Sequence, residues 1–315
     1  MTMSVYESKA VIGVDVAKHE LVIYDEQHER LIAIPNSKAD IKKWLKNLPS
    51  EVSIAIEATG SYHVLFANMA YKAGCAIYMI DGYALSHYRK SVNVRSKTDA
   101  LDARLLARFL SHESKKLKPW VPPSPLYLTL LSLFRRRAAL VKMRVSLTQS
   151  WANEPLLETE LSDHLIAMRR LEQAVEDKIR DVLDQAGLLS VVKRCMKVEG
   201  IGFLTAARLV ATYQRGAFDN SDAFIAFLGL DLRQVQSGQK KGQAKLTKRG
   251  DSEVRRLLHN AAMSASRSPR WKSYYQTRRD GKYSTTQALV MLARKLARVV
   301  FALLKSGDEY QPKTA

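Results

Sequence analysis

The sequence contains little cysteine, with only Cys75 and Cys195 among its 315 residues. The two lie far apart and do not have the spacing of a zinc motif. This excludes a disulfide framework and argues against a structural zinc site. So few cysteines are typical of a protein in a reducing compartment, and we expect a cytoplasmic location.

A long uncharged apolar run is also lacking. The best membrane candidate, Ala288–Leu304, is interrupted by Arg294, Lys295 and Arg298, so it predicts an amphipathic helix and not a membrane span. The first ten residues lack the apolar core of a signal peptide. We therefore expect no membrane partner.

Acidic residues are scarce, 31 against 50 basic ones, which gives a formal net charge of +19. Such an excess indicates a polyanionic partner, nucleic acid before an acidic membrane. Residues 1–152 carry 22 basic and 13 acidic residues, residues 153–188 carry 4 and 9, and residues 189–315 carry 24 and 9. We predict three segments with these boundaries, of which the last is a basic domain and the main polyanion binder.

The first segment alternates short Val- and Ile-rich runs with helical patterns. Strands are predicted at Ala10–Val16, Glu20–Asp25, Arg30–Ile34, Val52–Glu57 and Cys75–Ile80, and helices at Ser37–Leu48, Tyr62–Ala73 and about Thr98–Ser111. Three strands joined by hairpins, followed by alternating helices and strands, predict an α/β ribonuclease-H-like mixed sheet with helices on both faces. A Rossmann unit is excluded, because no crossover helix fits after the first strand.

The rest of the chain is predicted to be mostly helical. A cluster of prolines at 119–125 precedes a helix at Leu126–Trp151. Residues 156–189 form a coiled-coil or helical-hairpin arm, which either self-associates or packs on its own chain. Its apolar positions are Leu161, Leu165, Met168, Leu171, Val175, Ile179 and Leu183. A long polar loop follows at Gln234–Lys248.

Four acids are candidates for a shared site. Asp15 lies within a buried apolar run, and Glu57 ends the fourth predicted strand. The first and fourth strands are neighbours in a ribonuclease-H-like sheet, so these acids should meet at one edge. Asp99 and Asp102 share one face of a helix. Converging carboxylates provide the hard oxygen ligands of Mg²⁺, which supports phosphodiester chemistry.

Three of the four acids also have a structural explanation. Asp15 and Glu57 could simply end their strands, and Asp99 could belong to a helix capping box that begins at Ser96. Asp102 has no such explanation. The joint order of the acids, on strand one, strand four and a helix, is what favours the catalytic interpretation.

The basic segment contains two candidate nucleic-acid-binding features. Gly200 and Gly202 lie in a pattern typical of a helix-hairpin-helix turn, which allows a backbone approach to phosphate; a glycine cap between two packed helices is the alternative. The polar loop and the helix after it supply cations for phosphates. These are Lys240, Lys241, Lys245, Lys248, Arg249 and Arg255. Ser237 lies in this loop, and its surroundings do not distinguish it chemically from Ser252 or Ser264.

Three motifs of the first segment resemble a known family. They are Gly13-Val14-Asp15-Val16-Ala17-Lys18, Glu57-Ala58-Thr59-Gly60-Ser61-Tyr62 and Lys97-Thr98-Asp99-Ala100-Leu101-Asp102-Ala103. They look like the DEDD signature of the Piv-invertase-like insertion-sequence transposases, the one-ten and eleven-eleven groups. In the second half, Glu199–Gly202, Phe227–Leu230, Ser237-Gly238 and Lys248–Gly250 are similar too. One departure is Asp81-Gly82, where many relatives have Asn-Pro, and we expect it to affect only a loop.

The resemblance implies a RuvC-like domain, a coiled-coil arm and a C-terminal transposase domain. It implies that Asp15, Glu57, Asp99 and Asp102 hold Mg²⁺, and that Ser237 attacks a DNA phosphate to form a covalent link. It further implies donor and target DNA, a non-coding guide (bridge) RNA that pairs with both, and dimers or tetramers as the active form.

Alternative functions use the same residues differently. A Holliday-junction-type nuclease of RuvC-like fold would use the acids with water and no serine, and a site-specific invertase would belong to the same family. A non-catalytic nucleic-acid-binding protein would use the acids only structurally. The sequence lacks the glycine-rich phosphate loop that a sugar kinase on a related sheet would have.

Overall fold

The computed structural model describes residues 10–311, except Thr59, Arg95, Ala217 and residues 153–156, 234–235, 238–239 and 242–243. The chain forms two compact units, Met1–Pro122 and Pro123–Ala315, which divide inside the predicted proline cluster. The first unit therefore ends before the predicted domain boundary at residue 152. The reason is that helix α5 (Pro125–Ser150) packs against α6 (Glu158–Gln185) and α8 (Phe203–Tyr213) of the second unit.

The first unit is built on a five-stranded mixed sheet with the order β3-β2-β1-β4-β5. Its strands are β1 (Ala10–Val16), β2 (Glu20–Asp25), β3 (Arg30–Pro35), β4 (Val52–Glu57) and β5 (Ala76–Ile80). The first three strands pair antiparallel, whereas β1, β4 and β5 run parallel. This confirms the predicted neighbourhood of the first and fourth strands and is consistent with a ribonuclease-H-like layout.

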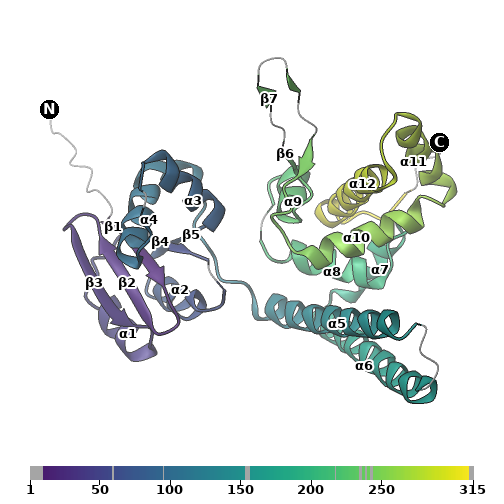
Figure 1. Cartoon of the computed structure of the whole chain (residues 1–315), viewed down its shortest axis with the longest axis horizontal. Helices are drawn as coiled ribbons and strands as arrows, with labels where there is room; N and C mark the ends of the chain where they lie inside the picture. The colour runs from purple at the N-terminus through teal and green to yellow at the C-terminus, as the bar shows by residue number, and fades with distance from the viewer. Residues whose placement is uncertain are drawn as a thin grey trace. The chain divides into compact units, whose positions relative to one another are not determined.

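The two faces of this sheet bury different helices (Figure 1). Side chains alternate along a strand, so Val14 and Ile56 pack with α1 (Lys38–Leu45) and α2 (His63–Lys72). The opposite face packs against α3 (Gly82–Ser91) and α4 (Asp99–Glu113). Because Asp15 follows Val14 and Glu57 follows Ile56, both acids lie on the α3/α4 face.

Helix α3 is the one α-helix described in this unit that the sequence pattern does not predict. Asp81 caps it, since its Oδ1 accepts a hydrogen bond of 3.1 Å from the backbone N–H of Ala84. Only Leu85 of this helix is buried, so its apolar periodicity is weak. The Asp-Gly pair at its start is also typical of a turn, so the sequence does not show that Asp81 caps a helix.

Helices α5 and α6 form a hairpin in the second unit (Figure 1). Met168, Ile179 and Leu183 are buried as expected for a helical seam, but Leu171 is 51% exposed and Glu172 is buried instead. Arg144 donates to both carboxylate oxygens of Glu172, at 2.6 and 3.2 Å. The buried face of α6 thus packs against α5 of the same chain. Self-association of the arm stays a prediction and would use another face.

The remaining helices share one core. They are α7 (Leu189–Met196), α8, α9 (Ser221–Phe227), α10 (Ser252–Ala265), α11 (Pro269–Asp280) and α12 (Thr285–Ser306). The amphipathic helix predicted over Ala288–Leu304 corresponds to α12, whose buried stripe packs inside this unit. Across the described residues, none of the helices combines the length and apolarity that a membrane crossing requires.

The segment predicted as a long polar loop contains short antiparallel strand pairs. β6 (Leu232–Arg233) pairs with β9 (Lys245–Leu246), and β7 (Gln236–Ser237) pairs with β8 (Lys240–Lys241). Figure 1 shows β6 and β7 beyond the helices of this unit. The loop prediction is wrong for these residues, because strands of two residues are too short to show an alternating pattern.

Candidate functional site

Gly13 sets the distance between β1 and α4. A Cβ atom at this position would lie 1.9 Å from the carbonyl oxygen of Ala103 and 2.6 Å from the backbone nitrogen of Ala107. The helix therefore crosses the strand in direct backbone contact, which only glycine permits. Asp102, next to Ala103, is brought to the strand that carries Asp15.

Asp15 and Glu57 occupy adjacent strands at matching heights. The register pairs Val14 with Ile56, so the next position on each strand is one of the two acids. The strands run parallel, and both acids lie near their carboxyl ends. This is the edge at which the sequence predicted a shared site.

The other three acids all affect the pKa of Asp15. The pKa of Asp15 is raised from 3.8 to about 6, first by burial and then by the negative charges of Asp99, Asp102 and Glu57. A hydrogen bond with the backbone of Val16 offsets part of the effect. Each of these three carboxylates is thus close enough to act on the charge of Asp15, and negative charges gathered in this way suit a bound cation.

Arg89 of α3 supplies the positive charge beside this group. Its Nη2 donates to Oδ1 of Asp102, whose side chain is 5% exposed. Within the described ranges, no three acidic, histidine or cysteine side chains are arranged to hold one metal ion. The donor chemistry fits a hard divalent cation, but Asp102 would have to exchange Arg89 for it. The sequence predicts no role for Arg89, because it does not predict α3.

Asp99 does not belong to a capping box. The cap of α4 is Thr98, whose Oγ1 accepts a hydrogen bond of 3.3 Å from the backbone N–H of Leu101. The predicted alternative role of Asp99, in a box beginning at Ser96, is therefore wrong. Asp99 and Asp102 both lie in the first turn of α4, where the helix dipole favours negative charge.

Gly82 lies against Glu57. A Cβ atom at Gly82 would approach Oε1 of Glu57 to 2.4 Å. The expectation that Asp81-Gly82 affects only a loop is therefore wrong, since this position starts α3 and touches one of the four acids. Glu57 and Gly82 lie far apart in the sequence, so no local pattern predicts that they touch.

In the second unit, the turn between α7 and α8 uses its two glycines differently. Gly200 has a φ of +84°, and a Cβ atom there would meet the carbonyl oxygen of Ala261 at 2.4 Å. Gly200 thus serves packing against α10, as in the alternative of two packed helices. Gly202, at the start of α8, faces open space. Its predicted phosphate contact stays a prediction.

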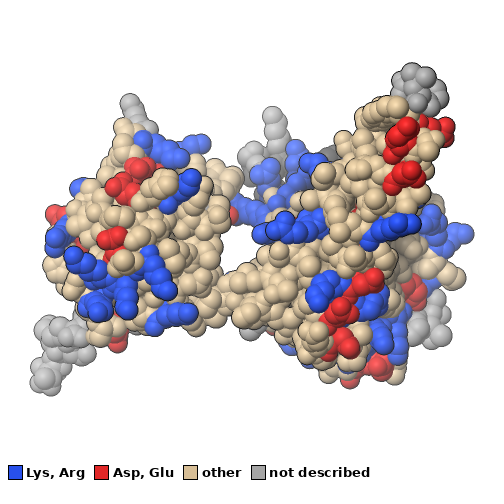
Figure 2. All heavy atoms as spheres, turned by 90° about the horizontal axis from the view of Figure 1, so that it is seen from below, with Lys and Arg blue, Asp and Glu red and all other residues tan. Residues whose placement is uncertain are grey.

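The predicted cations of the hairpin segment have different surroundings. Lys245, Lys248 and Arg249 are exposed. Arg255 is half-buried, and its Nη1 donates to the carbonyl oxygen of Gly250 at 2.7 Å, so it holds the turn before α10. Ser237, Lys240 and Lys241 belong to paired strands, but their side chains lie outside the described part of the structure. Figure 2 shows Lys and Arg side chains on the surface of each unit, with acidic groups among them.

Two family models match the chain. Residues 12–153 match the IS110 DEDD model, described as a transposase, and residues 192–276 match the model described as Transposase IS116/IS110/IS902 family. The first match contains all four acids, and the second contains the α7–α8 turn and the paired strands. The chain belongs to this transposase family. Membership implies an enzyme that cleaves and transfers DNA strands.

Several relatives of this transposase extend over nearly the whole chain. A probable family 20 transposase of Pseudomonas aeruginosa is 26% identical, with 96% of this chain and 98% of the relative aligned. A pilin gene-inverting protein of Moraxella bovis is 24% identical over 97% of this chain and 99% of its own length. A transposase for the element IS1328 of Yersinia enterocolitica is 24% identical over 95% and 98%.

Proposed function

We propose that this transposase cleaves and rejoins DNA at a magnesium site formed by Asp15, Glu57, Asp99 and Asp102. The observation that carries the proposal is the crowding of these carboxylates around Asp15, whose pKa is raised to about 6 by burial and by the other three acids. Outside a functional site such repulsion would only destabilise the fold. Bound Mg²⁺ would polarise phosphate oxygens and neutralise developing charge.

The chain's own residues have separate roles in this proposal. Gly13 holds α4 against β1, so that the helix acids and the strand acids face one site. Arg89 orients Asp102 and compensates part of its charge when no ion is present. Gly82 leaves room for the carboxylate of Glu57.

Ser237 is proposed as the nucleophile on the strength of its family motif. Its hydroxyl oxygen would attack a DNA phosphorus while its proton passes to a base, and the bond from phosphorus to the leaving strand would break. The leaving strand departs with a hydroxyl group. A strand hydroxyl then attacks the phosphoserine, which restores the phosphodiester and frees the serine. The number of phosphodiester bonds is unchanged, so no outside energy source is required.

We further propose that the protein acts as a homo-oligomer in the bacterial cytoplasm and that a non-coding RNA chooses its DNA sites. The basic segment, with 24 basic against 9 acidic residues, supplies phosphate contacts without a base-reading motif. Site choice by pairing would need only such contacts to the backbone. The three segments 1–152, 153–188 and 189–315 are proposed as catalytic, arm and transposase regions.

Strand exchange between plasmids that carry the element ends tests this function. Asp15→Asn and Asp102→Asn should lose exchange, as should wild type in EDTA, whereas Asp163→Asn on the exposed face of α6 should keep it. Ser237→Ala should lose both exchange and the covalent protein–DNA adduct. A Ser237→Ala protein that still cuts would identify a metal-dependent nuclease, and active Asp15→Asn and Asp102→Asn proteins would remove the carboxylate site. Sequencing of co-purified RNA tests the guide.

Site-specific inversion is a second candidate, favoured by the two pilin gene-inverting relatives from Moraxella. Inversion requires two sites in opposite orientation on one molecule, whereas transposition joins separate molecules. A plasmid with inverted sites and a plasmid pair with one site each distinguish the two outcomes.

A further inference from the structure

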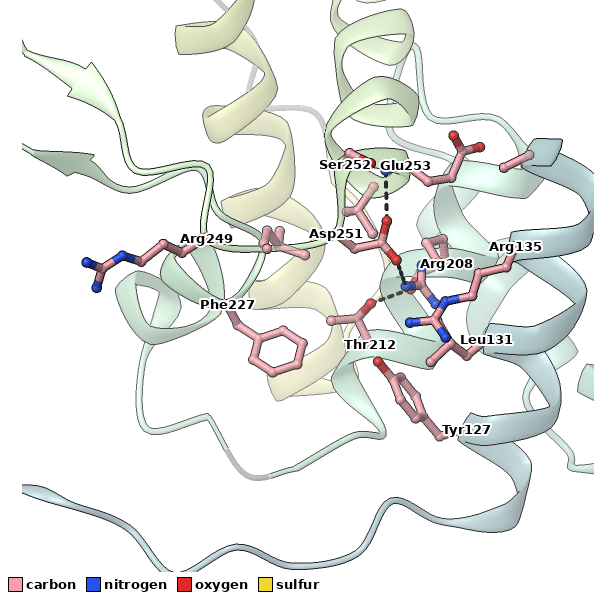
Figure 3. Close-up of a pocket in the computed structure, with 14 residues that line it drawn as sticks. Tyr127, Leu131, Arg135, Arg208, Thr212, Phe227, Arg249, Asp251, Ser252 and Glu253 are labelled. Carbon is pink, nitrogen blue, oxygen red and sulfur yellow. Dashed lines mark hydrogen bonds and ion pairs between the residues drawn. The ribbon is translucent and has the colours of Figure 1, made fainter. Parts of the chain in front are cut away.

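A pocket in the second unit lies apart from the four acids in sequence, and of the residues given a role above only Arg249 lines it. It has a volume of about 620 Å³, and its walls come from α5, α8, the end of α9 and the start of α10 (Figure 3). This volume is in the range of small-ligand sites and exceeds that of a single phosphate group. The pocket can therefore hold a phosphate together with an attached nucleoside.

A buried arginine faces this pocket. Arg208 is 2% exposed, and its Nη2 donates to Oδ2 of Asp251 at 2.6 Å. Among the described residues, its Nε and Nη1 have no hydrogen-bond partner. A buried guanidinium normally satisfies all of its donors, because unmade hydrogen bonds are costly. Arg208 therefore has donor capacity that its own fold does not use.

A second arginine approaches from another helix. Figure 3 shows the guanidinium groups of Arg135 on α5 and Arg208 on α8 pointing toward each other beside Asp251. Arg135 has no ion pair or hydrogen bond within the described part of the chain. Asp251 already neutralises Arg208, so what remains for an anion is the charge of Arg135 together with the two unused donors of Arg208.

The acids that line the pocket are already compensated. Asp251 pairs with Arg208 and also caps α10, accepting from the backbone N–H of Glu253 at 2.8 Å. Both carboxylate oxygens of Glu253 accept from Arg256, at 2.7 and 2.6 Å. The positive end of the α10 dipole opens at the same place. The pocket is therefore electropositive despite its two carboxylates.

Two glycines fix one wall. Gly229 has a φ of +70°, and a Cβ atom at Gly250 would lie 2.6 Å from the backbone nitrogen of Gly229. The turn after α9 and the turn before α10 thus touch backbone to backbone, which holds Phe227 and Asp251 on adjoining edges. This explains the Phe227–Leu230 and Lys248–Gly250 motifs, which the proposed chemistry does not use.

Phe227 gives the pocket a surface for stacking. Its ring is 44% exposed and is supported by an edge contact to Phe218, with ring centroids 5.4 Å apart. An exposed aromatic ring beside arginines is the usual combination in sites for unpaired nucleotides. Duplex DNA would offer phosphates here but no free base face.

We propose that this pocket binds the backbone phosphate of an unpaired nucleotide, with Arg208 and Arg135 on the phosphate oxygens and Phe227 against the base or sugar. The inference rests on the proposed function for the presence of nucleic acid. The strand is DNA or RNA, since both carry the same phosphate chemistry.

Binding in EDTA to labelled single strands of DNA and RNA of one sequence tests the proposal on the full chain. Arg135→Gln should weaken binding about fivefold or more and reduce the slope of log K against log salt by about 0.7. Phe227→Ala should weaken binding with no change of slope. The matched controls are Arg169→Gln, an exposed arginine of α6, and Met143→Ala, an exposed apolar residue of α5.

A second variant and a crosslink distinguish a loss of binding from a loss of folding. Arg208→Lys keeps the charge but loses the planar fork, so it should bind more weakly while its circular dichroism stays unchanged. A strand with 5-iodouridine should crosslink to Tyr127 or Phe227. The proposal is overturned if Arg135→Gln and Phe227→Ala bind both strands as well as their controls do. It is also overturned if inorganic phosphate alone, and neither strand, raises the melting temperature in an Arg135-dependent manner.

These outcomes are separable from failure of the proposed function. Asp15→Asn should bind single strands as wild type does, because its site is not needed for binding in EDTA. If that variant kept strand exchange, the carboxylate mechanism would fail while the binding result for the pocket would stand.

Discussion

The guanidinium of Arg89 pairs with the carboxylate of Asp102, where four acids of the first unit converge. The contact joins α3, a helix that the sequence pattern does not predict, to Asp102 of α4. Asp102 is one of the proposed metal ligands. The guanidinium of Arg89 is therefore a positive charge beside a carboxylate that the proposed Mg²⁺ would also bind. Arg89 and the ion therefore have overlapping electrostatic roles at this site.

Removing Arg89 should destabilise the metal-free protein. Arg89→Gln leaves the Asp102 carboxylate, 5% exposed, without its counter-charge, and the loss should be about 3 kcal/mol. Urea unfolding in EDTA measures it. Mg²⁺ should restore part of the loss in the variant. Lys116→Gln, which breaks an exposed pair with Glu113, should change stability by less than about 1 kcal/mol. Equal effects of the two variants would contradict the role of Arg89.

The raised pKa of Asp15 predicts a pH dependence. Its pKa is about 6 in the fold against 3.8 as the ordinary value, so the folded state binds the proton more tightly than the unfolded state. The destabilisation is full above pH 6, fades as the pH falls through that range and is absent below about pH 4. Asp15→Asn should thus be more stable than wild type at pH 7 without metal, and no more stable at pH 4. Urea midpoints at both pH values, with and without Mg²⁺, measure the difference, which Mg²⁺ should narrow at pH 7.

Substitution of Gly13 should separate α4 from β1. A methyl group at Gly13 would stand 1.9 Å from the carbonyl oxygen of Ala103, and backbone cannot rotate away as a side chain can. Gly13→Ala should lose about 3 kcal/mol or more and should also weaken Mg²⁺ binding, measured by calorimetry. Gly216→Ala, where no atom lies within 4 Å of the added group, is the control. A Gly13→Ala protein with normal stability would show that the close crossing is not required.

The buried pair in the helical hairpin should behave as a unit. Glu172→Ala leaves Arg144 without its bidentate partner and should cost about 3 kcal/mol. The double change of Arg144→Met with Glu172→Leu should recover most of this, because an apolar pair suits a helical seam. Thermal unfolding of Arg144→Met, Glu172→Leu and the double variant gives the coupling. Additive effects would mean that the two side chains do not depend on each other.

Local patterns predicted most of the first unit. All five strands and three of its helices follow from short apolar runs and the turn residues between them. The hairpins predicted the order of the first three strands, and the ribonuclease-H-like layout predicted that the first and fourth are neighbours. The acids at strand ends were identified for the same reason, since a charged residue interrupting a buried run is visible without any structure. Helix α3 was missed because a single buried leucine gives no periodicity.

The sequence by itself determined most element types of the first unit, the family and the candidate acids, because these depend on local spacing and on motifs that lie within a few residues of each other. Only the tertiary structure decided that Arg89 holds Asp102, that Gly82 touches Glu57, that Glu172 and not Leu171 enters the seam, and that Gly200 packs on α10. Each of these depends on which surfaces meet across long stretches of chain. Packing and charge pairing between such surfaces are set by the whole fold, and no local pattern carries them.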